Sequence, residues 1–285
     1  MSGLGNIFSK VFVSIFLVQV FCFCTLKPAF SMPTQEKSSP GQVDINQLRE
    51  DEEVVKLKAS INSNPGDLKN YERLGLYYVS KERFDDASEI FKKLILLNPK
   101  SAIYHDTLGS IYGMNRKLDE SVKEFKAAVR IDSRYPQAHK NLGNAYFGKG
   151  ELKNAIEEFK IALEIDPGYY QVYDNLGRVY MLQRRYDDAV KVLKKAIKIN
   201  PNFAKGYRTL GDIYIKTGKF REAINPLNRA KELDKKDSIA LRFLGDAYLR
   251  AGDFKEASKY YQEYLNLRPK GNDSSEIKKF VDRFK

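Results

Sequence analysis

The segment YDNLGRVY, from Tyr173 to Tyr180, recurs along the chain with its leucine, its glycine and its final position in register. Equivalent segments begin at residues 71, 105, 139, 207 and 241, so six copies follow one another at intervals of 34 residues. A fixed period of this length is the signature of a solenoid, in which each repeat packs only against its neighbours. The period therefore indicates the fold class more strongly than any other feature of the chain.

Each copy indicates two helices. In the first half of one copy, Tyr173, Leu176 and Tyr180 lie at i, i+3 and i+7, which places them on one face of an α-helix. In the second half of another copy, Ala155 and Phe159 follow the same helical spacing. A proline closes four of the six copies, where it cannot continue a helix. Each 34-residue unit is therefore predicted to be a helix–turn–helix.

Glycines mark two places in these units. Between the two halves, Gly150, Gly218 and Gly252 suit a left-handed turn; Glu82, Arg116 and Arg184 stand at the equivalent places in the other copies. A second glycine recurs inside every first helix, where it costs about 1 kcal/mol relative to alanine. We expect the second helix to approach closely there, with its small residue, Ala87 or the equivalent, as the partner.

The spacing aromatic-x2-Leu-Gly-x2-Tyr, then Ala-x3-Phe, then Pro resembles the tetratricopeptide repeat. The resemblance implies an all-α, right-handed superhelical solenoid of helix–turn–helix repeats with capping helices. The expected repeats are 68–101, 102–135, 136–169, 170–203, 204–237 and 238–271.

Both ends of the array are expected to carry caps that cover its apolar faces. Residues 45–67 read as an N-terminal capping half-repeat. Residues 272–285 read as a C-terminal capping helix, because Ile277, Phe280 and Phe284 form one apolar stripe. Pro226 departs from the pattern, and we expect it to bend the second helix of the fifth repeat.

The first 31 residues have the order of a secretory signal peptide. Lys10 precedes the apolar run Val11 to Leu26, and Ala29-Phe30-Ser31 supplies the small residues of a cleavage site. We expect cleavage after Ser31, a flexible tether over 32–44 and export to the periplasm or cell envelope. The alternative is an uncleaved N-terminal helix that anchors the chain in a membrane.

The chain is basic, with 49 Lys and Arg against 37 Asp and Glu, and cleavage would leave a net charge of +10. This balance favours acidic protein segments or anionic lipid headgroups as partners, and export makes nucleic acid the least suitable. A membrane periphery is therefore a possible site, and the oligomeric state stays open.

Catalytic, metal and cofactor sites are not expected. The chain has two cysteines and two histidines, too few for a zinc site or a disulfide-built domain. His105 and His139 are predicted to be packing residues, because they stand one repeat apart where other copies carry an aromatic residue. No phosphate loop or nucleophile motif is present, so an enzyme survives only as an undetected activity.

In the resembling family the first helices line a concave surface that meets partner peptides. At the matching positions of the last four repeats, the charged residues are Lys140, Arg178, Lys205, Arg208, Lys216, Arg242 and Arg250, against Asp174, Asp212 and Asp246. This net basic groove is predicted to bind an acidic or C-terminal segment of a protein. The alternative is that the groove only shares the basic character of the whole chain.

Four of these residues also resemble a carboxylate clamp, which holds the C-terminus of a peptide. They are Lys140, Asn144, Asn175 and Lys205. At the fifth position Thr209 stands where an arginine is expected, with Arg208 beside it, and the asparagines are also common in ordinary repeats of this family. The predicted binding residues are therefore Lys140, Asn144, Asn175, Arg178, Lys205, Arg208 and Arg242, in a non-enzymatic protein–protein interaction scaffold or, alternatively, a membrane-anchored assembly factor.

Overall fold

The computed structural model describes residues 45–284, and within this range every regular element is a helix. The all-α repeat fold is thus confirmed. The predicted signal peptide, its cleavage site and the tether over 32–44 lie outside the described residues.

The helices alternate along the chain between a 13- or 14-residue first helix and a 14-residue second helix of each repeat. They are α2 (Ile45–Ser63), α3 (Leu68–Ser80), α4 (Phe84–Leu97), α5 (Ala102–Met114), α6 (Leu118–Ile131), α7 (Pro136–Gly148), α8 (Leu152–Ile165), α9 (Tyr170–Leu182), α10 (Tyr186–Ile199), α11 (Ala204–Lys216), α12 (Phe220–Leu233), α13 (Ser238–Ala251), α14 (Phe254–Leu267) and α15 (Ser274–Arg283).

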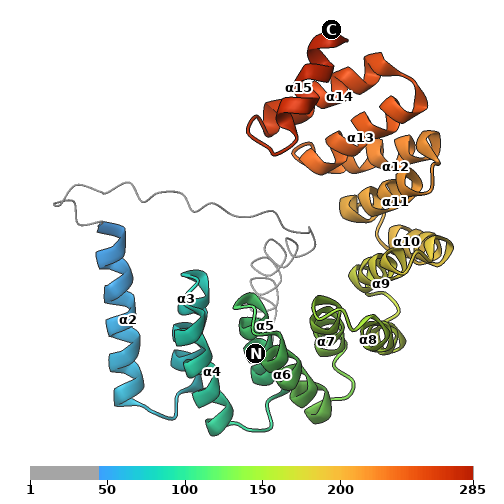
Figure 1. Cartoon of the computed structure of the whole chain (residues 1–285). Coiled ribbons are helices and arrows are strands. Elements are labelled where there is room, and N and C mark those ends of the chain that lie inside the picture. The colour runs from blue at the N-terminus through green and yellow to red at the C-terminus, as the bar shows by residue number, and fades with distance from the viewer. Residues whose placement is uncertain (1–44, 285) are drawn as a thin grey trace. The chain divides into compact units, whose positions relative to one another are not determined.

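The described residues divide after Ser133 into two compact units, α2 to α6 and α7 to α15. Within each unit, the two helices of a repeat lie side by side, and each second helix also contacts the following first helix (Figure 1). The recurring leucine of the first helix and the small residue of the second helix are buried in every repeat, as Leu142 and Ala155 illustrate. The sequence repeat is therefore a repeat of core positions.

The recurring glycine of the first helix lies against the large apolar residue sixteen positions later. A Cβ atom on Gly143 would stand 2.6 Å from the Phe159 ring. The close approach was expected, but the identity of its partner was wrong, because the small residue does not face the glycine's Cβ position. The small residue lies near the backbone of the glycine instead. In the second repeat this residue is Ser121, whose Oγ donates a 2.7 Å hydrogen bond to Gly109 O.

All six turns between paired helices contain one residue with a positive φ, as the sequence predicted for the three that carry glycine. Three of these residues are glycines, and three are not: Glu82 at 56°, Arg116 at 60° and Arg184 at 58°. A side chain costs roughly 1–2 kcal/mol in this left-handed region. The first and second units thus both tolerate local strain to keep the 34-residue period.

Arg184→Gly is expected to raise the free energy of unfolding by about 1 kcal/mol, because glycine removes that strain at the turn. Gly150→Ala is the converse control: nothing lies within 4 Å of the added Cβ, so any loss reports the backbone alone. Urea denaturation of the full chain measures both changes. A less stable Arg184→Gly variant would contradict the assignment of strain.

The second unit ends in α15, and aromatic residues in and just after this helix pack on the last repeat. The Phe280 ring meets Tyr261 edge-on, with centroids 5.5 Å apart, and Phe284 stacks on Phe254 at 5.1 Å. α12 continues from Phe220 to Leu233 through Pro226. No helix in the range 45–284 is both long and apolar enough to cross a bilayer.

Candidate functional site: the face of the first helices

The seven predicted binding residues all lie in the second unit, on four first helices that contact one another in succession. Lys140 and Asn144 belong to α7, Asn175 and Arg178 to α9, Lys205 and Arg208 to α11, and Arg242 to α13. We call their polar contacts, including those to neighbouring carboxylates, the polar ladder.

An amide pair joins the first two helices of the ladder. Asn175 Nδ2 donates a 2.9 Å hydrogen bond to Asn144 Oδ1, so the two asparagines of the predicted clamp do meet. Cations lie on the same two helices over aromatic rings: Lys140 Nζ is 5.5 Å from the Tyr169 centroid, and Arg178 Cζ is 5.5 Å from that of Phe147. Both cations are half-buried.

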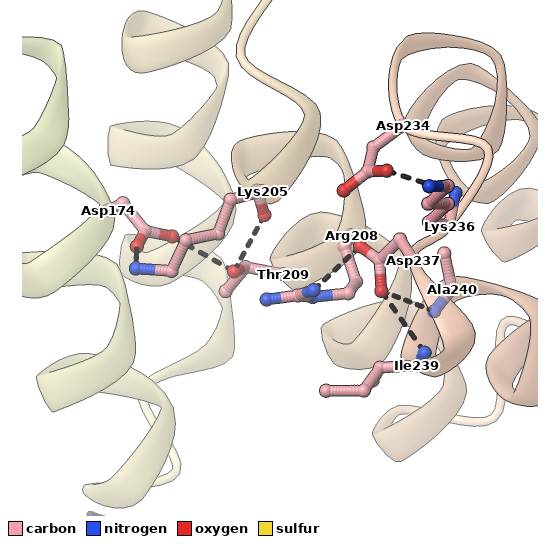
Figure 2. A network of polar contacts seen from close by, with 9 residues as sticks. All are labelled: Asp174, Lys205, Arg208, Thr209, Asp234, Lys236, Asp237, Ile239 and Ala240. Atoms are coloured by element: carbon pink, nitrogen blue, oxygen red, sulfur yellow. Dashed lines mark hydrogen bonds and ion pairs between the residues drawn. The ribbon is translucent and has the colours of Figure 1, made fainter. Parts of the chain in front are cut away.

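Lys205 turns toward a carboxylate of the chain itself (Figure 2). Its Nζ lies 2.7 Å from Asp174 Oδ2, and Thr209 Oγ1 donates a 2.9 Å hydrogen bond to Asp174 Oδ1. The Asp174 side chain is fully buried, and that of Lys205 is 22% exposed. Burial lowers the pKa of Lys205 to about 8, although the Asp174 charge acts in the opposite direction.

Two of the three arginines of the ladder, Arg208 and Arg242, are held by carboxylates from the turns that follow. Arg208 Nη1 donates a 2.6 Å hydrogen bond to Asp237 Oδ2, while Asp237 Oδ1 caps α13 through the backbone N–H groups of Ile239 and Ala240 (Figure 2). In the next repeat, Arg242 Nε lies 2.7 Å from Asp273 Oδ2. Each pair therefore ties one first helix to the start of the next first helix or cap.

Sequence reasoning missed Asp237 and Asp273 because they lie outside the helical positions that define the groove. A signal for both was present, since each is an aspartate directly before a helix, a position that favours such residues. Only Asp237 caps its helix with a side-chain hydrogen bond. With these two included, seven cations face five carboxylates. The face is less basic than the helical positions alone indicated.

The contacts separate the clamp residues into two groups. Asn144 and Asn175 are together, with Lys140 one turn before Asn144 on α7. Lys205 is paired with Asp174, and Arg208 is paired with Asp237. To replace the arginine that is missing from the clamp, Arg208 would have to lie beside Thr209 instead. A ligand carboxylate at Lys205 would have to compete with a buried carboxylate that is already in place.

Both histidines pack inside their repeats, each with a carboxylate partner. His105 Nδ1 lies 2.7 Å from Glu124 Oε2, and His139 Nδ1 lies 2.7 Å from Glu158 Oε2. Each glutamate is nineteen residues after its histidine, so the same contact occurs once in each unit. Across residues 45–284, no three His, Cys, Asp or Glu side chains are grouped so as to hold a metal ion.

A pocket of about 340 Å³ lies in the first unit, between α4 and the start of α6. Two of its four acidic residues are paired with lysines that also line it: Asp85 Oδ1 accepts a 2.8 Å hydrogen bond from Lys117, and Glu89 accepts one of 2.7 Å from Lys92. The pocket therefore offers mixed charge, with both of its lysines already paired.

Comparison with protein families finds three matching models, which carry two descriptions. "TPR repeat" matches residues 117–150, 143–184 and 177–218, and "Tetratricopeptide repeat" models match 68–101 and 208–273. Together these matches span more than half of the chain. No curated protein matches the sequence significantly.

Solved structures share the architecture at low sequence identity. The Cut9–Hcn1 structure matches with a TM-score of 0.65 and 17% identity, over 82% of this chain and 46% of that one, so this chain spans about half its length. PilF of Pseudomonas aeruginosa matches with a TM-score of 0.64 and 19% identity, over 74% of this chain and 96% of that one.

A third structure, YrrB, is described as a TPR protein with an unusual peptide-binding site. It matches with a TM-score of 0.53 and 22% identity, over 67% of this chain and 99% of that one. At these identities the likeness concerns the fold. Taken with the family matches and the 34-residue core repeat, it leads to one conclusion: the chain belongs to the tetratricopeptide repeat family.

Proposed function

We propose that this protein is an interaction scaffold that binds an extended, acidic segment of a partner protein along α7, α9 and α11. The observation that carries the proposal is the Asn144–Asn175 amide pair, with Lys140 and Arg178 on the same two helices. The repeat family supports a role in protein–protein interaction, and YrrB provides a similar fold with a peptide-binding site.

The chemistry of the amide pair suits a peptide backbone. A primary amide has two N–H donors and a carbonyl oxygen with two lone pairs, and the contact between Asn144 and Asn175 uses one donor and one oxygen. The remaining groups can pair with the C=O and N–H groups of an extended chain. Lys140 and Arg178 add positive charge, which favours acidic side chains or a terminal carboxylate.

The ion pairs of Lys205 and Arg208 give these residues a different role in the proposal. They hold the α9–α11 and α11–α13 contacts and so fix the surface on which the segment lies. Recognition of a terminal carboxylate falls to Lys140 and Arg178, whose described neighbours include the aromatic rings of Tyr169 and Phe147.

The proposed location is the periplasm or cell envelope, with the chain cleaved after Ser31; the alternative is retention of residues 1–31 as an anchor. The sequence order of Lys10, apolar run and small residues supports export. Intact mass of the protein from cell fractions decides between these forms, because an N-terminus at Met1 in envelope material would exclude cleavage.

A photo-crosslinking residue at Met181, one turn after Arg178 on α9, is expected to capture the partner segment in cells of the source organism. The control is the same residue at Lys160 on α8, a second helix outside the ladder. Capture at both positions alike, or at Lys160 alone, would contradict binding along the first helices.

With the captured segment as a peptide, Lys140→Ala is expected to weaken binding by about 1.5 kcal/mol, the scale of a hydrogen bond to a charged group. Titration calorimetry with free-acid and amidated peptides then tests C-terminal recognition. Equal affinity for the two forms leaves acidic side chains as the recognised groups.

A further inference from the structure

One second helix carries a stripe of lysines that the polar ladder does not involve. On α10, Lys191, Lys194, Lys195 and Lys198 lie at i, i+3, i+4 and i+7, and all four are exposed. A rise of 1.5 Å per residue makes this stripe about 10 Å long. Four ammonium groups thus share one short helical face, which we call the lysine stripe.

The stripe has no neutralising partner within the described range 45–284. None of its four lysines forms an ion pair there, and its one aromatic contact is Lys195 Nζ at 6.0 Å from the Tyr173 centroid. Of the two acidic residues at the start of α10, Asp188 pairs with Arg185 at 2.7 Å, and Asp187, four residues before Lys191, forms no ion pair with the stripe. The full positive charge of the stripe therefore faces solvent.

The stripe is specific to α10 within its unit. The equivalent four positions hold a single cation in each of the other second helices, namely Lys160 in α8, Arg229 in α12 and Lys259 in α14. Arg229 and Lys259 are moreover paired with Glu232 and Glu256. In the first unit, α6 carries three exposed cations at the same positions, Lys123, Lys126 and Arg130. What distinguishes α10 is that all four of its positions are lysines and that none of the four forms an ion pair within the described range.

The composition of the stripe fits a hydrated anionic surface better than a macromolecule with fixed contact points. Lysine is a strongly hydrated point charge, whereas arginine supplies the planar, bidentate geometry of specific ion pairs. Protein interfaces deplete lysine and rely on buried aromatic anchors, and single-stranded nucleic acid needs exposed aromatic platforms. The exposed side chains of the stripe offer neither.

The sequence gives an independent reason to place the chain beside a bilayer. If the apolar run Val11 to Leu26 is retained it would hold the chain at a membrane, and if it is cleaved it would take the chain across one. We propose that the lysine stripe of α10 docks the protein on a bilayer surface rich in anionic phospholipid headgroups. Since the stripe and the ladder use different residues, this contact adds a membrane surface to the proposed peptide binding.

The expected strength is modest and sensitive to salt. Each basic residue near an anionic leaflet contributes about 1 kcal/mol, which corresponds to about a fivefold change in binding. Because the charges are screened over a Debye length of about 8 Å at physiological ionic strength, the contact should be reversible by added salt.

Lysine footprinting of the full chain tests the proposal. The protein is acetylated briefly in the presence of vesicles, and mass spectrometry reports the rate at each lysine. With vesicles of equal phosphatidylglycerol and phosphatidylcholine, acetylation of the four stripe lysines is expected to slow several-fold, and high salt should restore it. Pure phosphatidylcholine vesicles are the control, because any binding through the apolar run would occur on them as well. Exposed Lys100, Lys219, Lys255 and Lys278 are internal references.

A pair of charge-matched variants gives a second test. Changing all four stripe lysines to glutamine should abolish most of the preference for anionic over zwitterionic vesicles, at about fivefold per lysine. The same change at Lys100, Lys219, Lys255 and Lys278 should retain that preference. Equal loss in both variants, uniform protection of all lysines, or protection by polyglutamate but not by anionic vesicles would overturn the proposal.

Discussion

Asp174→Ala is expected to destabilise the second unit by about 3–5 kcal/mol. The substitution leaves the Lys205 ammonium in a largely buried place without its carboxylate, which is the costly way to break a buried ion pair. It also removes the acceptor of the Thr209 hydroxyl. Within residues 45–284, no group donates an aligned hydrogen bond to Asp174 Oδ2, so this oxygen depends on the ion pair with Lys205. Urea denaturation of the full chain measures the loss.

Removing both charges is the control for this prediction. Asp174→Leu combined with Lys205→Met should recover most of the stability, because apolar residues of similar volume can replace a buried pair at little cost. A double variant as unstable as Asp174→Ala would show that the polar contacts themselves, rather than an isolated charge, hold α9 to α11.

The same pair gives a pH dependence with a definite sign. The pKa of Lys205 is lowered to about 8 in the folded protein from 10.5 in the unfolded chain, so the unfolded chain binds more protons between these values. Stability therefore rises with pH from about 8 toward 10, and the contribution is of the order of 1–3 kcal/mol. Lys205→Met should remove that rise; a persistent slope would assign it to another group.

The paired helices and the turns between them could be predicted from the sequence, because they depend on short-range patterns of residues. The turn at Arg184 followed from its place between two helical patterns, although its positive φ is unfavourable for arginine. The partner of the recurring glycine did not follow. Periodicity gives the face of each helix, but not the angle at which two faces meet, and that angle puts Phe159 rather than Ala155 opposite Gly143.

The polar ladder was predictable in its members and not in its pairing. A helical position identifies Lys205 as a residue of the inner face, whereas its choice of Asp174 depends on the offset between neighbouring repeats. Long cationic side chains reach several Å, so one position is compatible with many carboxylates. Asp237 shows the further difficulty that one residue can cap a helix and bind an arginine of the previous repeat.

Gly245→Leu is expected to cost about 3 kcal/mol, because this glycine has the tightest contact with an aromatic ring in the second unit. A Cβ atom would stand 2.4 Å from Tyr261 Cδ1 and Cε1, so the ring must move. The Tyr261 ring is buried, its hydroxyl donates a 2.7 Å hydrogen bond to Asp246 Oδ1, and its edge contacts Phe280 of the cap. Overpacking costs about 1–3 kcal/mol, and loss of the Tyr261 hydrogen bond adds about 1 kcal/mol. The higher helix propensity of leucine relative to glycine offsets a small part of this cost.

Gly177→Leu in the same unit is the matched control for that substitution. There the nearest atom to the added Cβ is Leu193 Cγ at 3.0 Å, and an aliphatic side chain can change rotamer where a packed ring cannot. Its cost should fall within the 1–3 kcal/mol of ordinary overpacking and below that of Gly245→Leu. Hydrogen exchange should also show faster opening of α14 and α15 in the Gly245 variant, since Tyr261 supports the cap. Equal midpoints for the two variants would mean that the repeated glycine reflects backbone requirements rather than the size of the residue it faces.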